Sequence, residues 1–158
     1  MLNAKKNKKV IEIIRTDSEN KDFIELVRHL DAELAIRDGD DHAFYAQFNK
    51  IAKLKYVVLA HEDGKALGCG AIRALDSGEI EVKRMFVPLE SRGKGIATLV
   101  LLELENWARE LSYTRCVLET GLKQPEAIRL YEKNGYERIP NYGQYVDVGS
   151  SVCFGKDI

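Results

Sequence analysis

The sequence has little cysteine, histidine and proline. Its cysteines number three, an odd count, and no two of them form a C-x-x-C pair. A disulfide framework and a zinc site are therefore both disfavoured, and the thiols are predicted to be buried and free. The three histidines are scattered, with no i, i+4 spacing on a helix. We expect no metal site.

The sequence also lacks a strong net charge and a long apolar run. Lys and Arg total 24 against 25 Asp and Glu, which leaves no overall field to attract nucleic acid or an anionic membrane. No apolar run approaches the roughly 18 residues of a membrane span. The basic start, Met1 to Lys9, is not followed by the apolar segment of a signal peptide. These absences predict a cytoplasmic protein with no nucleic-acid and no membrane partner.

The residues that are present suit a globular domain. The chain has 158 residues, of which 45% are hydrophobic and 31% are charged. This composition can fill a core and argues against disorder. Because single domains typically have about 100–150 residues, we expect one domain at residues 10–158, preceded by a flexible basic tail at residues 1–9.

Hydrophobic spacing and turn residues predict an alternation of strands and helices. The predicted strands are residues 10–15, 56–60, 66–75, 79–87, 115–119, 136–139 and 152–155. The predicted helices are residues 41–52, 96–111, 125–134, and a first helix that Asp17 or Ser18 caps and that runs past Leu34. This order predicts an α/β (α+β) fold in which a mixed, mostly antiparallel sheet is flanked by helices.

The most informative segment is a glycine-containing loop, R-G-K-G, between the strand that ends near Val87 and the helix that begins at Ile96. Gly93 and Gly95 allow a ligand to approach the backbone closely, and the first N–H groups of a helix have no intrahelical partners. Arg92 and Lys94 add local positive charge. The loop therefore predicts a phosphate or pyrophosphate site.

Two common nucleotide-binding loops do not fit this segment. A Walker loop needs Ser or Thr after its lysine, but glycine follows Lys94, and no glycine stands five positions before Gly93. A dinucleotide fingerprint needs a third glycine, where this sequence has Thr98. A plain strand-to-helix connection without a ligand is the alternative interpretation.

The loop and a later segment together resemble the GNAT superfamily of N-acetyltransferases. Residues 92–97, RGKGIA, are similar to the family's R/Q-x-x-G-x-G/A signature, and residues 124–136, QPEAIRLYEKNGY, are similar to its N-x-x-A-x-x-L-Y-x-x-x-G-F motif. Gln124 and Tyr136 are the departures, standing where Asn and Phe are usual. The ending of the chain resembles a group of small bacterial acetyltransferases that mostly have no assigned substrate.

The resemblance implies an acetyl-CoA donor. Its pyrophosphate would be held by backbone N–H groups, and its pantetheine would lie beside the strand before the loop like an additional strand. The loop itself supports the first of these expectations independently. The predicted cofactor-binding residues are Met85, Phe86, Val87, Arg92, Gly93, Lys94, Gly95, Ile96, Ala97, Thr98 and Gln124.

Acetyl transfer to an amine needs a deprotonated nucleophile, a polarised thioester carbonyl and a hydrogen bond for the departing thiolate. By resemblance in position, Glu81 is the predicted base, acting directly or through water, and Tyr131 is the predicted acid. Glu79 is the second choice for the base, because period-two alternation would put it on the face that Glu81 occupies. The alternatives are a salt-bridged strand carboxylate beside Lys83 and Arg84, and a tyrosine that only packs in the core.

The acceptor pocket is expected, on family analogy, between the first two helices and the loop around Tyr142 and Tyr145. Further candidates for contact with the acceptor are Arg37, Tyr45, Asn49 and Arg73. The predicted activity is transfer of acetyl from acetyl-CoA to a primary amine of a small or amino-acid-like molecule. A protein N-terminal or lysine acetyltransferase and a non-catalytic acyl-CoA sensor are the alternatives, and a homodimer is left open.

Overall fold

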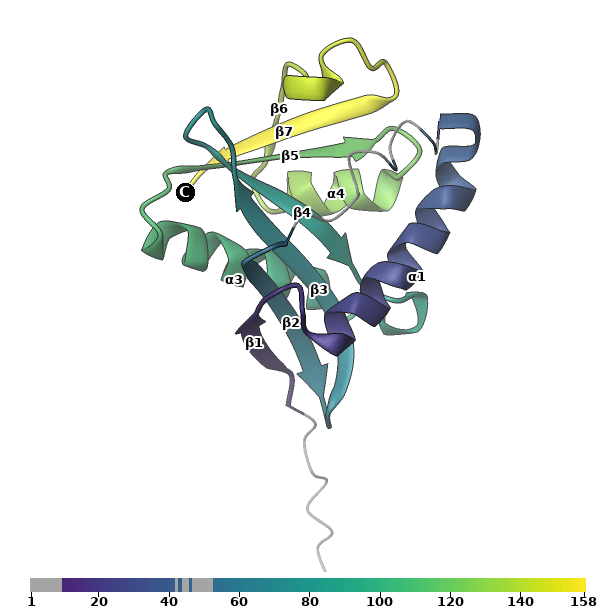
Figure 1. The fold of residues 1–158 in the computed structure, drawn as a ribbon, viewed down its shortest axis with the longest axis vertical. Coiled ribbons are helices and arrows are strands. Elements are labelled where there is room, and N and C mark those ends of the chain that lie inside the picture. Colours follow the sequence, from purple (N-terminus) through teal and green to yellow (C-terminus); the bar gives the residue numbers. More distant parts are fainter. Residues whose placement is uncertain (1–9, 42, 44–45, 47–52) are drawn as a thin grey trace, which may run out of the picture.

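The structure, a computed structural model, describes residues 10–41, 43, 46 and 53–158. Within these residues one seven-stranded sheet has the order β1-β2-β3-β4-β5-β7-β6 (Figure 1). The strands are β1 (Glu12–Thr16), β2 (Tyr56–Glu62), β3 (Lys65–Ala74), β4 (Ile80–Phe86), β5 (Arg115–Gly121), β6 (Glu137–Ile139) and β7 (Ser151–Asp157). Among the described strands, only β4 and β5 pair in parallel. The mixed, mostly antiparallel sheet is confirmed.

The described helices are α1 (Lys21–Asp38), α3 (Ile96–Glu110) and α4 (Pro125–Lys133), with short 3-10 turns η1 (Gly39–Asp41), η2 (Leu89–Ser91) and η3 (Gly143–Tyr145). The predicted cap of the first helix is wrong. Asn20 caps α1, since its side chain accepts hydrogen bonds from the backbone N–H groups of Asp22 and Phe23. Most of the helix predicted at residues 41–52 lies outside the described residues.

The helices cover the two faces of the sheet separately. Along β2, Val57 and Leu59 pack against α1, while Val58 and Ala60 belong to the core on the other face, with α3 and α4. Both faces are buried, so this strand has a continuous apolar run rather than an alternating one. Figure 1 shows α1 crossing one face while α3 lies behind the sheet.

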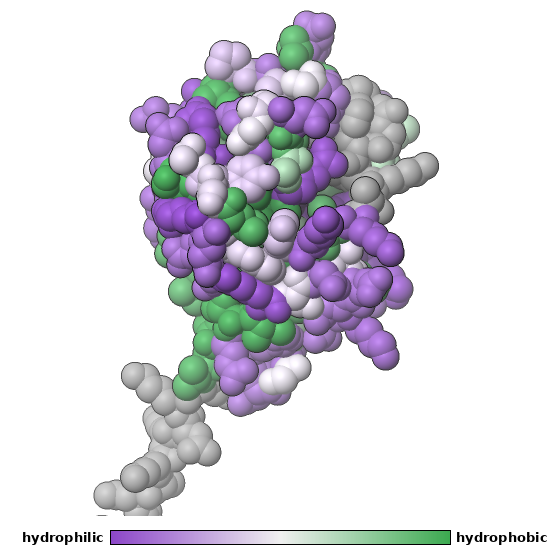
Figure 2. All heavy atoms as spheres, turned by 60° about the vertical axis from the view of Figure 1, so that its left-hand side comes forward, coloured by the Kyte–Doolittle hydropathy of each residue, from purple (hydrophilic) through white to green (hydrophobic). Residues whose placement is uncertain are grey.

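The outer surface is mainly polar. Figure 2 shows one face on which hydrophilic side chains predominate and apolar ones gather in several small groups. Exposed large apolar side chains, such as those of Ile36, Leu89 and Val146, are distributed over different elements. Within the described part of the chain, no helix combines the length and the apolar character needed to cross a membrane.

One ionic cluster is buried in the core between α3 and the end of the sheet. The side chain of Glu105 is fully buried; its carboxylate accepts hydrogen bonds from the Tyr136 hydroxyl at 2.9 Å and the Lys156 ammonium at 2.7 Å. A buried carboxylate without such donors would be costly. Tyr136, where the family motif usually has Phe, therefore has a local reason for its hydroxyl.

We predict that Tyr136→Phe lowers the free energy of unfolding by about 1–3 kcal/mol, because a buried charged acceptor loses one of its donors. The shift would appear in the urea midpoint with an unchanged m-value. Tyr113→Phe is the control, since Tyr113 packs partly buried against the same core. Equal midpoints for the two variants would contradict the role assigned to the hydroxyl.

Candidate active site

The central feature of the site is an opening in the sheet between β4 and β5. These strands pair only at Ile80 with Cys116 and at Glu81 with Val117. Beyond these pairs the strands separate, so the last residues of β4 have no strand partner on the β5 side. The backbone groups on this edge of β4 are open to a ligand that lies alongside them.

A β-bulge bends β4 at the point where the opening begins. Arg84 and Met85 together lie opposite Gly70, between the pairs Cys69 with Phe86 and Ala71 with Lys83. Arg84 has a φ of +59°, a left-handed conformation that costs about 1–2 kcal/mol in a residue other than glycine. Its guanidinium is buried and pairs with Asp31 of α1 at 2.7 Å. This ion pair fastens the bulge to the helix and helps to hold it in place.

The larger cavity of the opening has a volume of about 510 Å³. It lies between α1, the end of β4, the glycine loop and α4. Ten of the predicted cofactor-binding residues line it: Met85, Phe86, Val87, Arg92, Gly93, Gly95, Ile96, Ala97, Thr98 and Gln124. Lys94 does not line it, because its side chain is exposed to solvent.

The glycine loop has the backbone conformation that the predicted anion site requires. Gly93 and Gly95 have φ values of +82° and +76°, which L side chains rarely adopt. Gly95 is the N-cap of α3 and supplies no side-chain cap, so the first N–H groups of this 15-residue helix are free to bind an anion. The Arg92 side chain instead ties the loop together, donating to the Val87 carbonyl at 2.7 Å and to Glu33 at 2.8 Å.

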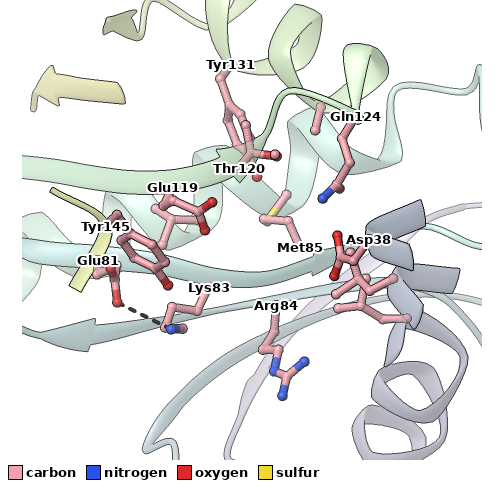
Figure 3. A pocket seen from close by; sticks show the side chains of 15 residues that line it. Asp38, Glu81, Lys83, Arg84, Met85, Glu119, Thr120, Gln124, Tyr131 and Tyr145 are labelled. Atoms are coloured by element: carbon pink, nitrogen blue, oxygen red, sulfur yellow. Dashed lines mark ion pairs between the residues drawn. The ribbon is translucent and has the colours of Figure 1, made fainter. Parts of the chain in front are cut away.

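A smaller inner cavity of about 110 Å³ continues from the larger one toward the middle of the sheet. The two cavities share six lining residues: Leu30, Leu34, Met85, Gln124, Ala127 and Tyr131. Figure 3 shows charged side chains around the inner cavity. A ligand that fills the larger cavity can therefore extend its end into a polar chamber.

Glu81 lies in the wall of this inner cavity, as its predicted role requires. It is 2% exposed. The Tyr142 hydroxyl donates a hydrogen bond to its Oε2 atom at 2.5 Å, while Arg73 and Lys83 lie 3.5 and 3.6 Å from Oε1. The carboxylate of Glu81 is thus held in place by one phenol hydroxyl and two nearby cations.

The structure does not support the second choice for the base. Glu79 precedes β4 and does not line either cavity. Its carboxylate pairs with Arg115 at 3.2 Å and accepts a hydrogen bond from Ser77. Period-two alternation does not relate Glu79 to Glu81, because Glu79 lies just before the strand begins.

A second carboxylate, Glu119 of β5, faces the inner cavity and was missed by the sequence analysis. The pKa of Glu119 is raised to about 7, chiefly by burial and also by the negative charges of Glu81 and Asp38, against the lowering effects of its hydrogen bond with Ser151 and the charge of Lys83. The sequence does show a glutamate near the end of the strand predicted at residues 115–119. It does not show that this strand lies beside β4, which is what brings Glu119 to the cavity.

Tyr131 of α4 lines both cavities, at the point where they join. It is 6% exposed and packs edge-on against Tyr136, with the ring centroids 5.8 Å apart. Burial raises the pKa of its hydroxyl, and the nearby charge of Glu119 raises it further. The hydroxyl therefore stays protonated and can act as a hydrogen-bond donor at neutral pH.

The predicted acceptor residues are only partly brought together. Tyr145 lines the inner cavity, and Tyr142 reaches it through Glu81. Arg73 lies beside Glu81 but does not line either cavity, and Arg37 lines the larger cavity instead. Tyr45 and Asn49 lie outside the described residues.

Arg37 has a structural role across the opening. It pairs with Glu126 of α4 at 2.9 Å and with Glu33 of its own helix at 3.0 Å. Since α1 and α4 cover opposite faces of the sheet, this contact between them is made through the gap left by β4 and β5. Among the described residues, no group of three or more His, Cys, Asp or Glu is arranged to hold a metal.

Comparison with known proteins identifies the class to which this fold and site belong. The model of the acetyltransferase (GNAT) family matches residues 12–136. The IAA acetyltransferase of Azospirillum brasilense is 32% identical over 139 residues, which cover 85% of this chain and 90% of that protein.

Solved structures agree with this assignment. A structure from Klebsiella pneumoniae described as an acyl-CoA N-acyltransferase has a TM-score of 0.78 and 27% identity, with 94% and 97% of the two chains covered. A GNAT family acetyltransferase from Elizabethkingia anophelis, which has acetyl-CoA bound, has a TM-score of 0.68 and 16% identity, with 96% and 100% covered, and so shares the fold.

The chain belongs to the GNAT family of acetyltransferases. It is an enzyme of the acetyl-CoA-dependent acetyltransferase class. The resemblance found in its two motifs is thereby confirmed.

We predict that Gly95→Ala weakens acetyl-CoA binding about tenfold or more, a loss of about 1.4 kcal/mol or more. The added Cβ meets nothing within the protein, so the loss comes from the strained φ and from obstruction of the anion site. Gly78→Ala is the matched control, because Gly78 has a φ of +85° in a turn that does not line either cavity. Calorimetry on both variants measures the difference, and equal losses would remove the argument for an anion site.

We predict that Glu119→Gln stabilises the protein above neutral pH. The pKa of Glu119 is raised to about 7 by burial in the folded state, against about 4.3 when unfolded. Its contribution to stability is therefore fully present below about pH 4 and is lost as the pH rises through 7. The variant should gain about 1–3 kcal/mol relative to wild type at pH 8.

The measurement is the difference in thermal midpoint between Glu119→Gln and wild type from pH 4.5 to 8. Glu132→Gln, which neutralises an exposed side chain on α4, controls for the simple loss of charge. A Glu119→Gln difference that does not grow with pH would show that Glu119 is not held in its protonated form by the fold.

Proposed function

We propose that this protein transfers an acetyl group from acetyl-CoA to a primary amine of a small molecule, with both substrates bound at once. The observation that carries the proposal is the opening between β4 and β5, in which a large cavity and a small polar chamber join at Tyr131. The first suits the donor and the second suits the acceptor. Direct transfer needs the two to meet in this way.

The residues of the larger cavity fit acetyl-CoA. The unpaired N–H groups at the start of α3 and the positive φ of Gly93 and Gly95 suit a pyrophosphate. The free edge of β4 at Met85 to Val87 suits the amide groups of pantetheine, which would bind like an added strand. Bound acetyl-CoA supplies a thioester, whose carbonyl carbon is open to attack by an amine.

The inner cavity contains the groups needed at the amine. An alkyl ammonium with a pKa near 10 must lose a proton before it can attack, and two carboxylates, those of Glu81 and Glu119, line this cavity. The Tyr131 hydroxyl, at the junction of the cavities, donates a hydrogen bond toward the departing sulfur. Backbone N–H groups of β4 are suited to polarise the carbonyl.

A small acceptor is favoured over a protein chain by the size of the inner cavity. Its volume of about 110 Å³ is lined by α1, β4, β5, α4 and the loop around Tyr145, and this size suits a short amine better than an extended peptide. The similarity to the IAA acetyltransferase of Azospirillum brasilense also favours a small acceptor. Retention of Glu81, Glu119 and Tyr131 in the cavities argues against a non-catalytic sensor.

Calorimetry with acetyl-CoA, CoA, ATP and NAD, followed by a free-thiol release assay, tests the proposal. The amine panel would contain benzylamine, ethanolamine, spermidine, single amino acids and a lysine-containing peptide. Selective acetyl-CoA binding with thiol release from a small amine is the expected result. Release from the peptide alone would favour a protein acetyltransferase, and binding without release from any amine would favour a sensor.

We predict that Tyr131→Phe lowers kcat about 10- to 100-fold and changes the KM for acetyl-CoA less than about threefold, because a donor to the leaving thiolate acts mainly in the transition state. Steady-state kinetics with the best amine of the panel measure the effect. Tyr56→Phe is the control, since Tyr56 packs against Trp107 at a ring distance of 5.1 Å and does not line either cavity. An unchanged kcat in Tyr131→Phe would leave the ring with a packing role only.

A further inference from the structure

We propose that Glu119, rather than Glu81, is the carboxylate that takes the proton from the acceptor amine. This inference rests on the proposed function and assigns one step of it. It follows from the position of Glu119 relative to the reacting atoms, from the contacts that Glu81 already makes with Tyr142, Arg73 and Lys83, and from the side chains that surround Glu119.

Position is the first argument. The amine must approach the thioester carbon, which is bonded to the sulfur, and Tyr131 stands where the two cavities meet. Figure 3 shows Glu119 between Tyr131 and Glu81. The charge of Glu119 is close enough to raise the pKa of the Tyr131 hydroxyl. Glu119 is therefore the carboxylate nearer to the reacting centre.

The engagement of Glu81 is the second argument. Its Oε2 atom is occupied by the hydrogen bond from Tyr142 at 2.5 Å. Its Oε1 atom is buried without a hydrogen-bond partner, but lies 3.5 and 3.6 Å from the cations of Arg73 and Lys83. These contacts give the Glu81 carboxylate a structural role, as the counter-ion of two cations and the acceptor for a phenol hydroxyl.

The surroundings of Glu119 favour proton uptake. On β4 it faces Lys83 and Glu81, on α1 Asp38, and at the start of β7 Ser151, while Tyr131 and Tyr145 lie close enough to feel its charge. Burial is the largest influence on its pKa, and burial favours the neutral acid. Burial also lowers the pKa of Lys83, so this lysine compensates the charge of Glu119 only in part. The site thus holds Glu119 between its two protonation states near neutral pH.

The step balances in protons and electrons. The acceptor enters as an ammonium ion and gives one N–H proton to the Glu119 carboxylate. The nitrogen lone pair that is released forms the N–C bond, and the C–S bond breaks with its electron pair on the sulfur. A second N–H proton ends on the sulfur, beside the Tyr131 hydroxyl. Glu119 returns its proton to solvent before the next cycle.

The pH dependence of kcat/KM for the amine separates the two carboxylates. With Glu119 as the base, the reactive form contains ionised Glu119 and the ammonium, so the wild-type rate rises with pH and levels off above about pH 7. In Glu119→Gln the free amine must be supplied by solvent. The rate should then rise about tenfold per pH unit toward the amine's own pKa near 10, with no plateau.

At pH 7 the expected loss in Glu119→Gln is about 10²–10³-fold, because roughly one alkyl amine in 1,000 is unprotonated there. Glu81→Gln is the matched variant, with the same chemical change on the neighbouring strand. It should keep the plateau above pH 7, with a loss of about tenfold or less from the disturbed Lys83 and Tyr142. Both variants should bind acetyl-CoA within about threefold of wild type by calorimetry, which checks that the fold is intact.

The outcomes distinguish this assignment from the proposed function. A plateau that persists in Glu119→Gln, or one that disappears in Glu81→Gln instead, would overturn the assignment while the wild-type turnover still supports an acetyltransferase acting on small amines. Absence of thiol release by wild type with every amine would overturn the proposed function, and this assignment with it. Loss of the plateau in Glu119→Gln alone supports Glu119 as the catalytic base.

Discussion

The separation of β4 from β5 after two residue pairs is the constraint on which the rest of the site depends. If these strands continued to pair, the backbone groups at the end of β4 would be satisfied by β5, and no cavity would remain between them. The separation is prepared by the bulge at Arg84, which bends β4, and is made stable by the helices packed on either side. The gap between β4 and β5 is thus the place where both substrates are expected to meet.

An opening in the sheet also changes how the two helical layers interact. In an unbroken sheet α1 and α4 would be kept apart by the strands, but here Arg37 and Glu126 form an ion pair across the gap. Glu33 joins Arg37 and Arg92, which links α1 to the glycine loop as well. The mouth of the cavity therefore has ion pairs beside the apolar side chains that line its interior. Such contacts cost less to rearrange than packed side chains when a ligand enters.

The sequence predicted best the features that depend on residues close together in the chain. The glycine loop, α3, α4 and the fold class were all found, because left-handed glycines, helical spacing and a proline at the first turn act locally. The sequence was less informative about the residues at which a helix or a strand begins. Asn20 displaced Asp17 and Ser18 as the cap by two or three positions, which spacing alone does not resolve. Glu79 was grouped with Glu81, although it lies just before the strand begins.

The importance of Glu119 could not be predicted, because it depends on which strands are neighbours and on where they part. In the sequence Glu119 is separated from Glu81 by 38 positions, and nothing marks one of them as more basic. Only the fold surrounds Glu81 with Arg73, Lys83 and Tyr142. Only the fold buries Glu119 near two other carboxylates and a partly compensating lysine.

Two glutamates of equal intrinsic acidity are thereby made different. Glu81 is the counter-ion of two cations and the acceptor for a phenol hydroxyl, and Glu119 is the carboxylate that we propose exchanges a proton. This division follows from the same opening that admits the substrates. Only where the strands part can a carboxylate be both buried enough to hold a proton at neutral pH and close enough to an amine to receive one.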